Sequence, residues 1–343
     1  MQLIKTPTKG MNDYLPRETR LREYVKGVII RAYEKNGFSM IETPAVEHIE
    51  NLTGKNGGDN EKLIFKIMKR GEKLNEAAGN DAELCDSGLR YDLTVPLSRY
   101  YANNQAKLPS PFMAMQIGNV WRADRPQKGR FRQFTQCDID ILGDSTQLAE
   151  ITLISATTGV LRELGFDNFT VRINDRRLLK VCADYCGFKP EDCDKVFITL
   201  DKMDKIGLDG VKRELVEEDF DEASVEKYVA LYENCDAVSV SEFAADRLGG
   251  NGADIAASLE SIMRCATAAT AGGCSLNFDP TLVRGMSYYT GTIFEISMDG
   301  YGYSVGGGGR YDEMLAKFSG QKTPACGFSL GFERIVAALA DRG

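Results

Sequence analysis

Residues 115–143 read MQIGNVWRADRPQKGRFRQFTQCDIDILG, and this stretch decides the fold. Apolar residues alternate with other residues at both of its ends, which predicts two strands joined by a long loop. The loop carries a single acid, Asp124, among five cations: Arg122, Arg125, Lys128, Arg130 and Arg132. Guanidinium groups gathered at one turn are typical of a site that binds oxyanions. An exposed hairpin with a solvated loop is the alternative interpretation.

The second of these strands carries polar side chains at every other position, namely Gln136, Asp138 and Asp140. Residues spaced by two lie on one face of a strand, so these three side chains share a face. An acidic face suits a cationic small molecule, and the basic loop beside it suits polyphosphate. Phe134, just before them, either stacks on a flat base or belongs to the core.

The composition is that of a globular protein with room for about two domains: 343 residues, 43% hydrophobic and 27% charged. The net charge of −8 means that any contact with RNA must come from a local basic patch. Nine cysteines at irregular positions, with no signal peptide before Gly10, indicate reduced thiols in a cytoplasm. No apolar run is long enough to span a bilayer.

Histidine is nearly absent, and this restricts the possible chemistry. A Ser-His-Asp or Cys-His mechanism would have to rest on His48 alone. A zinc site at Cys182, Cys186 and Cys193 would lack a nearby histidine, and buried structural cysteines are the simpler interpretation. Catalysis must therefore act through positioning and charge stabilisation, with a metal brought in by the substrate.

The rest of the chain predicts an antiparallel sheet with helices packed on it, the α+β class. We expect helices at 17–36, 95–101, 146–164 and 311–318, and after Gly331 as far as residue 340. We expect strands at 38–41, 62–68, 89–95, 275–278, 287–298 and 301–305, and from residue 325 up to Gly331. Helical patterns and acids dominate residues 178–273, which predicts a helical insertion domain inside a domain made of 1–177 and 274–343.

Two further segments fit the chemistry of the loop. In the strand expected at 89–95, Asp92 and Thr94 share a face and suit an ammonium group, although Thr94 merely capping the next helix fits equally well. At 282–295, Arg284 precedes Tyr288 and Tyr289. Adjacent tyrosines on a strand would face opposite ways, so only one of them would line a site.

Two C-terminal features point to a ligand that approaches the backbone and carries phosphate. Gly306 to Gly309 would allow close approach, with a flexible turn as the alternative. Arg334 falls in the first turn of the last helix, where a cation opposes the macrodipole unless an anion binds there. With Arg122 and Arg284, it would support in-line attack of a carboxylate on a nucleoside triphosphate.

These segments, in this order, resemble the class II aminoacyl-tRNA synthetases, and specifically the histidyl-tRNA synthetases. Residues 37–44, 118–143 and 327–334 are similar to the three motifs of the class, the first of them usually a dimer-interface element. Residues 284–291 and 308–312 are similar to two signatures of the histidine enzymes. The resemblance spans nearly the whole chain. It implies a class II catalytic domain, an antiparallel sheet flanked by helices, with a helical insertion domain at 178–273.

The resemblance also implies roles for individual residues. Arg122 would bind the α-phosphate of ATP, Arg334 the γ-phosphate, and Arg284 the charge at the reacting carboxylate. Other positions that it places at ATP are Asp124, Arg130 and Phe134. Asp92, Thr94 and Gln136 would hold the α-amino group of histidine, Asp140 and Tyr289 would read the imidazole, and Tyr311 would close the pocket. Leu93 and Tyr288 belong to the same histidine-binding set.

The implied protein is a cytoplasmic homodimer that does not associate with membranes. It would activate L-histidine with ATP and Mg²⁺ to histidyl-adenylate and pyrophosphate, and then transfer histidine to the 3′ end of tRNA(His). No organic cofactor and no metal held by protein alone is expected. Asp92 and Asp140 stand where many relatives have glutamate, and Ser287 where many have aspartate.

The chain stops at Gly343, without the anticodon-binding domain that the family usually adds, so we expect a catalytic core. One alternative is the regulatory subunit of ATP phosphoribosyltransferase, a paralogue that senses histidine without chemistry. The complete set of arginines favours the active core. A ligase for another amino acid is the third reading.

Overall fold

The computed structural model of the chain describes residues 3–53, 59–80, 83–126, 129–235, 238–284 and 288–342. The chain divides into two compact units. Unit 1 comprises Met1–Asp140, Leu315–Gln321 and Ser329–Gly343, and unit 2 comprises Ile141–Met314 and Lys322–Phe328. The predicted separation of 178–273 as a domain of its own stays a prediction.

Eight strands are hydrogen-bonded in the order β1-β5-β6-β11-β10-β9-β7-β8. Their bounds are β1 Ser39–Met40, β5 Phe112–Trp121, β6 Gln133–Leu142, β7 Phe169–Asp175, β8 Ser275–Phe278, β9 Thr292–Met298, β10 Ser304–Arg310 and β11 Ala325–Gly331. β9 pairs antiparallel with both β7 and β10, whereas β1 pairs parallel with β5 and β7 with β8. A sheet of this kind with helices places the chain in the predicted α+β class.

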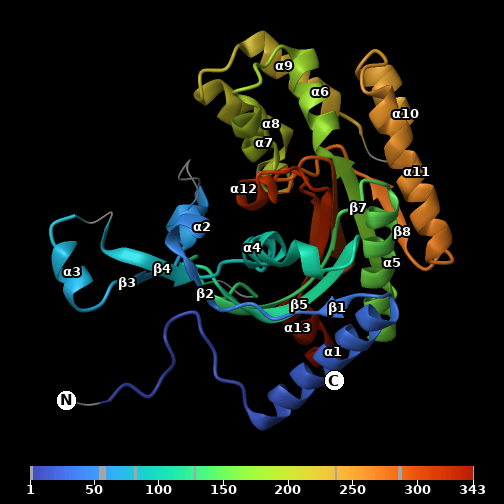
Figure 1. The fold of residues 1–343 in the computed structure, drawn as a ribbon. Coiled ribbons are helices and arrows are strands. Elements are labelled where there is room, and N and C mark those ends of the chain that lie inside the picture. Colours follow the sequence, from blue (N-terminus) through green and yellow to red (C-terminus); the bar gives the residue numbers. More distant parts are fainter. Residues whose placement is uncertain are drawn as a thin grey trace. The chain divides into compact units, whose positions relative to one another are not determined.

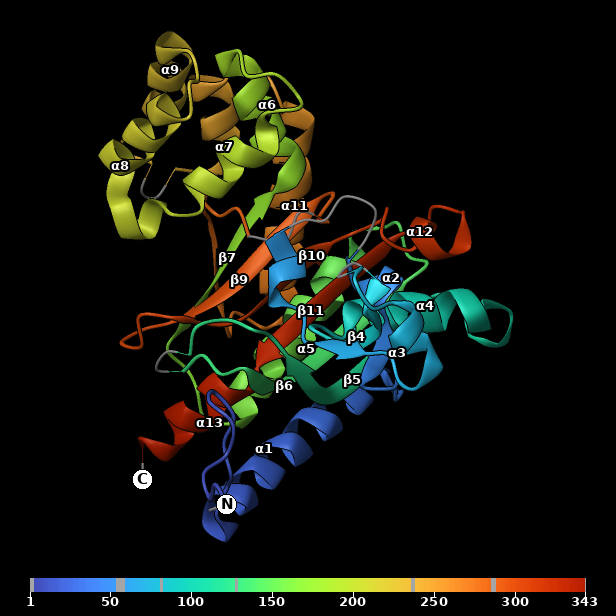
Figure 2. The ribbon, with the colours of Figure 1, turned by 90° about the vertical axis from the view of Figure 1, so that its left-hand side faces the viewer.

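Unit 1 begins with α1, Pro16–Lys35, whose buried stripe includes Val25, Ile29 and Tyr33. Two features favour this start. Pro16 occupies the first helical position, and the carboxylate of Glu18 accepts the N–H of Leu15 at 2.8 Å. Gly37, with φ +90°, ends the helix as the sequence predicts. α1 lies beside α13, Phe332–Ala340, in both views (Figures 1 and 2).

Unit 1 also contains a small antiparallel sheet in the order β2-β4-β3, formed by β2 Val46–His48, β4 Cys85–Leu89 and β3 Lys66–Met68. Its other helical segments are α2 Ile49–Thr53, η1 Asp59–Leu63, α3 Glu72–Glu76, α4 Thr94–Asn104, η3 Gln105–Lys107 and α12 Ala316–Ser319.

Unit 2 is built on β7, where Phe169, Val171 and Ile173 alternate into the core. α5, Leu148–Glu163, lies beside α11, Ala253–Ala269, as Figure 1 shows. Between them in sequence come α6 Arg176–Cys186, α7 Cys193–Leu200, α8 Met203–Glu217, α9 Glu222–Tyr232, α10 Val240–Glu242 and η4 Phe243–Arg247. Aromatic rings hold this helical part together, with Tyr228 packed edge-on to Phe188 at 5.4 Å and to Tyr232 at 5.1 Å.

The strand predicted at 89–95 is wrong, because β4 ends at Leu89 and α4 begins at Thr94. The carboxylate of Asp92 accepts the N–H of Val95 at 3.0 Å, which ties residues 92–95 into a helix start. The flexible turn considered for residues 306–309 is also wrong, since all four glycines lie within β10.

Other predicted elements are shorter than expected. The helix predicted at 146–164 begins at Leu148, because Asp144 accepts the N–H of Thr146 at 2.7 Å and holds a turn. The helix predicted at 311–318 is reduced to α12, since Asp312 accepts the N–H of Ala325 at 2.9 Å. Only 66–68 of the strand expected at 62–68 is extended, and 292–298 of the one at 287–298.

All nine cysteines are free thiols, and Cys182, Cys186 and Cys193 are buried, as structural cysteines would be. None of the helices in the described part of the chain is long and apolar enough to cross a membrane.

Candidate functional site

The predicted site residues fall into two groups, one in each unit. Unit 1 holds Leu93, Asp92, Thr94, Arg122, Asp124, Arg130, Phe134, Gln136, Asp140 and Arg334; unit 2 holds Arg284, Tyr288, Tyr289 and Tyr311. Gly285, Met286 and Ser287, including the predicted departure at Ser287, lie outside the described residues.

Arg122 directly follows β5, at the point where the strand gives way to the basic loop. Its Nε donates to the carbonyl of Tyr91 at 2.9 Å, and its guanidinium lies 5.1 Å from the ring of Phe134. No described residue accepts a hydrogen bond from its terminal nitrogens. The guanidinium is therefore fixed at its base, stacked on one side, and able to offer two donors to an oxyanion.

The rest of the basic loop is less firmly held. Arg132 donates from Nε to the carbonyl of Asp124 at 3.0 Å, whereas the guanidinium of Arg130 stands 3.6 Å from the Asp124 carboxylate. The Arg130 side chain is 58% exposed, and Arg125 is exposed too, whereas Lys128 lies outside the described residues. The loop thus has an arginine anchored through Nε at each end, Arg122 and Arg132, and exposed cations at Arg125 and Arg130 between them.

Asp92 is buried between β4 and α4, with 2% of its surface exposed. One oxygen, Oδ1, accepts the N–H of Val95, and within the described residues the other, Oδ2, has no hydrogen-bond partner. Burial raises the pKa of Asp92, against the lowering effect of the Val95 N–H and of Arg122. A buried carboxylate oxygen without a donor is an attractive partner for an ammonium group.

The neighbours of Asp92 complete this corner of unit 1. Leu93 and Thr94 are buried, and the carbonyl of Leu93 accepts a hydrogen bond from Gln116 Nε2 at 3.0 Å. Gln116 in turn accepts from the hydroxyl of Thr43 at 3.0 Å. The role of Gln116 has no local signal in the sequence, because Thr43 and Leu93 lie far from it in the chain.

On β6, the polar face predicted from the spacing of Gln136, Asp138 and Asp140 is buried. Gln136 Nε2 donates to the hydroxyl of Ser329 at 3.0 Å and lies 3.4 Å from Asp138, while no described group pairs with Gln136 Oε1. Burial and the nearby charge of Asp140 raise the pKa of Asp138 well above its usual value. Asp92 raises that pKa further and Arg122 lowers it, so these charges act on one another.

Arg334 is the third residue of α13, as predicted. The residue before it, Glu333, forms a buried ion pair with Arg22 and also accepts the backbone N–H of Thr135 at 3.1 Å. An acid at this position satisfies the macrodipole and ties α13 to α1 and β6. Glu333 carries no local sequence signal for this role, because its partners Arg22 and Thr135 lie far from it in the chain.

In unit 2, Arg284 has a left-handed backbone with φ +59°, which is uncommon for a residue other than glycine. Its terminal nitrogen donates to Glu295 Oε2 at 2.7 Å, and among the described residues its buried Nε lacks a partner. A Cβ on Gly307 would come within 2.6 Å of the guanidinium carbon. Strained backbone, an unpaired buried donor and a cleared space are features of a functional position.

Three tyrosines pack next to one another in unit 2. The ring of Tyr288 lies 4.8 Å from that of Tyr289 and 6.0 Å from that of Tyr311. The prediction that the adjacent tyrosines face opposite ways is wrong, because β9 begins only at Thr292 and residues 288–290 are not a strand. Tyr289 and Tyr311 are both buried, which gives unit 2 an aromatic wall with polar tips.

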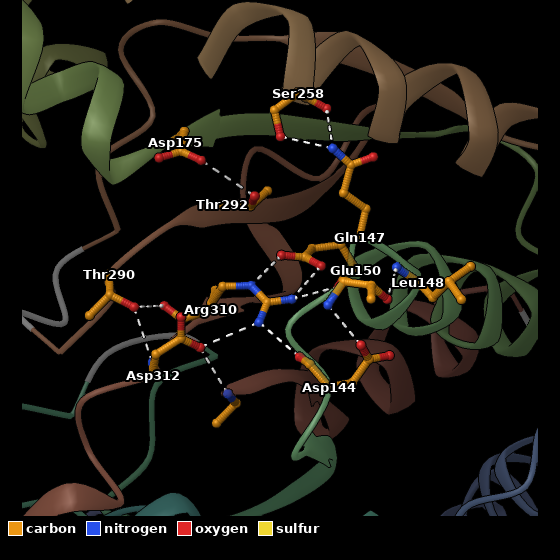
Figure 3. Close-up of polar contacts among 12 residues, drawn as sticks. Asp144, Gln147, Leu148, Glu150, Asp175, Ser258, Thr290, Thr292, Arg310 and Asp312 are labelled. Atoms are coloured by element: carbon orange, nitrogen blue, oxygen red, sulfur yellow. Dashed lines mark hydrogen bonds and ion pairs between the residues drawn. The ribbon is translucent and has the colours of Figure 1, made fainter. Parts of the chain in front are cut away.

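Arg310, at the end of β10 and next to Tyr311 in the chain, connects several segments of unit 2 (Figure 3). It makes a bidentate ion pair with Glu150, both bonds 2.7 Å long, and donates to the carbonyls of Asp144 and Thr146 at 3.0 Å. Asp312 lies 3.3 Å from the same guanidinium, and its N–H donates to the hydroxyl of Thr290. The network holds together residues 290 and 310–312, which are the chain neighbours of Tyr289 and include Tyr311.

Comparisons with known proteins identify the family of this chain. A family model described as histidyl-tRNA synthetase matches residues 10–335. A relative named histidine–tRNA ligase from Leifsonia xyli is 49% identical over 96% of this chain and 79% of its own length. A probable histidine–tRNA ligase from Tropheryma whipplei is 42% identical over 98% of this chain and 80% of its own.

A solved structure of histidyl-tRNA synthetase from Nostoc superposes with a TM-score of 0.83 at 27% identity, covering 100% of this chain and 77% of that one. A structure described as an ATP phosphoribosyltransferase regulatory subunit/histidyl-tRNA synthetase from Bacillus halodurans shares the fold, with a TM-score of 0.79 at 22% identity, over 99% of this chain and 84% of that one. The sequence matches and the shared fold together establish that this chain belongs to the histidyl-tRNA synthetase family.

Proposed function

We propose that the chain is a histidine–tRNA ligase that activates L-histidine with ATP and then transfers it to the 3′ end of tRNA(His). Membership of the family and relatives that bear this name support the proposal. The single observation that carries it is the group of buried carboxylates at Asp92, Asp138 and Asp140, beside an arginine whose terminal nitrogens are available. Such a group suits a molecule with an ammonium group that reacts with a phosphate ester.

The activation step is an in-line displacement. A carboxylate oxygen of histidine attacks the α-phosphorus of ATP, and the bond from that phosphorus to the bridging oxygen of the β-phosphate breaks. Pyrophosphate leaves with the bond's electrons, together with Mg²⁺ that ATP brings with it. Because no proton must be removed from a carboxylate, the protein needs only to position the reactants and stabilise charge.

Roles for the cations follow from their surroundings and from the family. Arg122, anchored through Nε, binds the α-phosphate, with Asp124, Arg130 and Phe134 completing the ATP site. Arg334 binds the γ-phosphate. Arg284 stabilises the negative charge shared by the attacking carboxylate and the α-phosphate. Arg284→Ala should lower turnover by on the order of 10²-fold or more, as removal of one oxyanion donor does.

Histidine is held through its two cationic or donor groups. Asp92, Thr94 and Gln136 bind the α-amino group; the acceptors are Oδ2 of Asp92 and Oε1 of Gln136, which have no partner among the described residues. Asp140 and Tyr289 bind the imidazole, with Leu93, Tyr288 and Tyr311 around it. The raised pKa of Asp92 fits this role, because an arriving ammonium group restores the charged carboxylate.

Histidine-dependent ATP–pyrophosphate exchange tests the function directly. We expect exchange with histidine and background rates with each of the other nineteen standard amino acids. Exchange with a different amino acid would make the protein a ligase of another specificity. Histidine binding without any exchange would instead favour the histidine-sensing regulatory paralogue, whose fold a solved relative shares.

The same proposal includes a homodimer in the cytoplasm, with a catalytic domain of 1–177 and 274–343 and a helical insertion domain of 178–273. Sedimentation of the purified chain tests the dimer, and a monomer at micromolar concentration would contradict it.

Asp140→Ala should raise the KM for histidine far more than the KM for ATP. An equal effect on both substrates would make Asp140 a structural residue.

A further inference from the structure

The side chain of Arg284 lies at one end of a row of groups that crosses three strands of unit 2. The register of the sheet pairs Glu295 on β9 with Arg172 on β7 on one side and with Gly307 on β10 on the other. Arg284 lies over Gly307, where a side chain would collide with its guanidinium. The missing Cβ at Gly307 therefore leaves the space in which Glu295 reaches Arg284.

The Glu295 carboxylate is shared between two guanidinium groups, one on each oxygen. Oε2 accepts from Arg284 at 2.7 Å, and Oε1 stands 3.5 Å from the terminal nitrogen of Arg172. The side chain of Glu295 is 18% exposed and that of Arg284 24%, so solvent screens this pair only partly. A carboxylate held from both sides has little freedom to rotate. The guanidinium of Arg284, which is bonded to it, is therefore held in one orientation as well.

The strand β7 also shapes the loop that carries Arg284. Arg172 forms an ion pair from Nε with Asp279, which in turn accepts from the N–H and hydroxyl of Thr281 at 2.9 and 2.7 Å. Asn174, two residues along and fully buried, donates to the carbonyls of Pro280 and Leu282 at 3.1 and 3.0 Å. These bonds fix the loop 279–283 just before the left-handed residue Arg284.

A polar cavity of about 190 Å³ lies against this row, lined by Arg172, Asp201, Asp204, Thr281 and Glu295 among others. Solvent can therefore reach the far side of Arg172 and Glu295. The cavity is also lined by Leu282 and Val283, so the loop that carries Arg284 borders open space on this side. Two anchors hold Arg284 in place, one on the loop and one on the guanidinium.

We infer that Glu295 and Arg172 are positioning residues for Arg284: Glu295 aims its guanidinium, and Arg172 holds both Glu295 and the loop. The inference rests on the proposed function for its effect on rate. Its structural part, that Glu295 creates a docking place for a guanidinium group, stands independently. In this inference both residues act on the reaction through Arg284, which each of them holds directly or through a neighbour.

The central variant is Glu295→Gln, which keeps size and an acceptor oxygen but removes the charge. We expect kcat for pyrophosphate exchange to fall roughly tenfold, while KM for histidine and for ATP changes less than about threefold and the melting temperature hardly moves. In the Arg284→Ala background the same substitution should cause no further loss. Asp204→Asn is the matched control, because Asp204 contacts Arg172 at 3.3 Å from an exposed position and should leave kcat within about twofold.

Ethylguanidine provides a readout that does not depend on activity. It should raise the melting temperature of Arg284→Ala by occupying the vacated place, and should fail to do so once Glu295→Gln is added. Equal shifts in both proteins, or an undiminished kcat in Glu295→Gln, would overturn the inference. Absence of histidine-dependent exchange in the unmodified protein would instead overturn the proposed function, and the ethylguanidine result would still decide the docking place.

Discussion

The Asp92 carboxylate and the backbone N–H of Val95 form a 3.0 Å hydrogen bond that starts α4 and points the second carboxylate oxygen into a buried space. The same side chain thus performs a folding task with Oδ1 and leaves Oδ2 for a ligand. An isosteric substitution can separate these two roles. An amide can still accept the N–H of Val95 but lacks the charge that would bind a ligand.

Asp92→Asn should therefore impair histidine binding without disrupting the fold. We expect KM for histidine to rise about 10- to 100-fold, the range for loss of one charge-assisted hydrogen bond, and KM for ATP to change little. Steady-state pyrophosphate exchange measures both constants. Asp86→Asn, an exposed aspartate on β4, is the control and should leave both unchanged. A similar rise in KM for ATP would refute a specific role at the ammonium group.

Asp138→Asn should make the protein more stable at neutral and alkaline pH. Burial raises the folded-state pKa of Asp138 above its unfolded value, so its ionisation costs stability as pH rises through the folded-state pKa. The amide removes this cost. We expect the melting temperature of the variant to exceed that of the parent by roughly 2–4 °C at pH 8, with the difference shrinking as pH falls toward the ordinary aspartate range.

Asp221→Asn gives the opposite sign and serves as the contrast. Asp221 caps α9 by accepting the N–H and hydroxyl of Ser224, and these bonds lower its pKa. Its ionised form stabilises the fold above the unfolded pKa and loses that effect as pH falls. The variant should be less stable than the parent at neutral pH. Melting temperatures of both variants and the parent are measured between pH 4.5 and 8.5. If the difference between Asp138→Asn and the parent does not change with pH, the buried-charge argument is contradicted.

Arg122→Ala and Arg130→Ala should differ sharply although both remove a guanidinium from one loop. Arg122 is anchored by Tyr91 and Phe134, so its loss should lower kcat/KM for ATP by on the order of 10²-fold or more. Arg130 is exposed and stands 3.6 Å from Asp124, so its loss should cost less than about tenfold. Exchange rates as a function of ATP concentration compare them. Equal losses would mean that charge in the loop, not the anchored geometry, is what matters.

Gly308→Ala should prevent correct folding or lower the free energy of unfolding by several kcal/mol, because the added Cβ would be forced against backbone atoms. A Cβ there would stand 2.0 Å from the carbonyl oxygen of Gly327, and peptide groups cannot yield as side chains do. Gly159→Ala is the matched control: on the exposed face of α5, no atom of the part of the chain that the structure describes lies within 4 Å of its Cβ, so stability should rise by about 0.5–1 kcal/mol. Urea denaturation measures both, and a well-folded, equally stable Gly308→Ala protein would contradict the packing.

The elements that the sequence predicted well are those whose pattern is local. The strands around the basic loop, the stripe of Val25, Ile29 and Tyr33 on α1, and the strand–glycine–helix unit at the C-terminal end all follow from periodicity within one segment. The polar spacing on β6 likewise placed Gln136 next to Asp138.

The errors arise where a side chain or a distant strand overrides local pattern. Where a strand was predicted, the Asp92 carboxylate accepts the N–H of Val95 and favours the start of a helix. The glycines of β10 read as a turn because their extended backbone is imposed by pairing with β9. The contact between Glu295 and Arg172 could not be predicted from sequence, since it depends on the register of β7 against β9. Register is a property of the sheet and cannot be read from either strand alone.

For four residues, Gly306 to Gly309, strand β10 offers only peptide groups to its surroundings. Substitution of amino acids can reshape a surface only by exchanging one side chain for another, and here every exchange adds atoms. At Gly308 and Gly309 the added carbon would meet backbone oxygens of Gly327 and Thr292 at 2.0 and 2.5 Å. Even the smallest substitution at these two glycines therefore causes a collision. A change in ligand preference has to come from substitution of the side chains that face the strand.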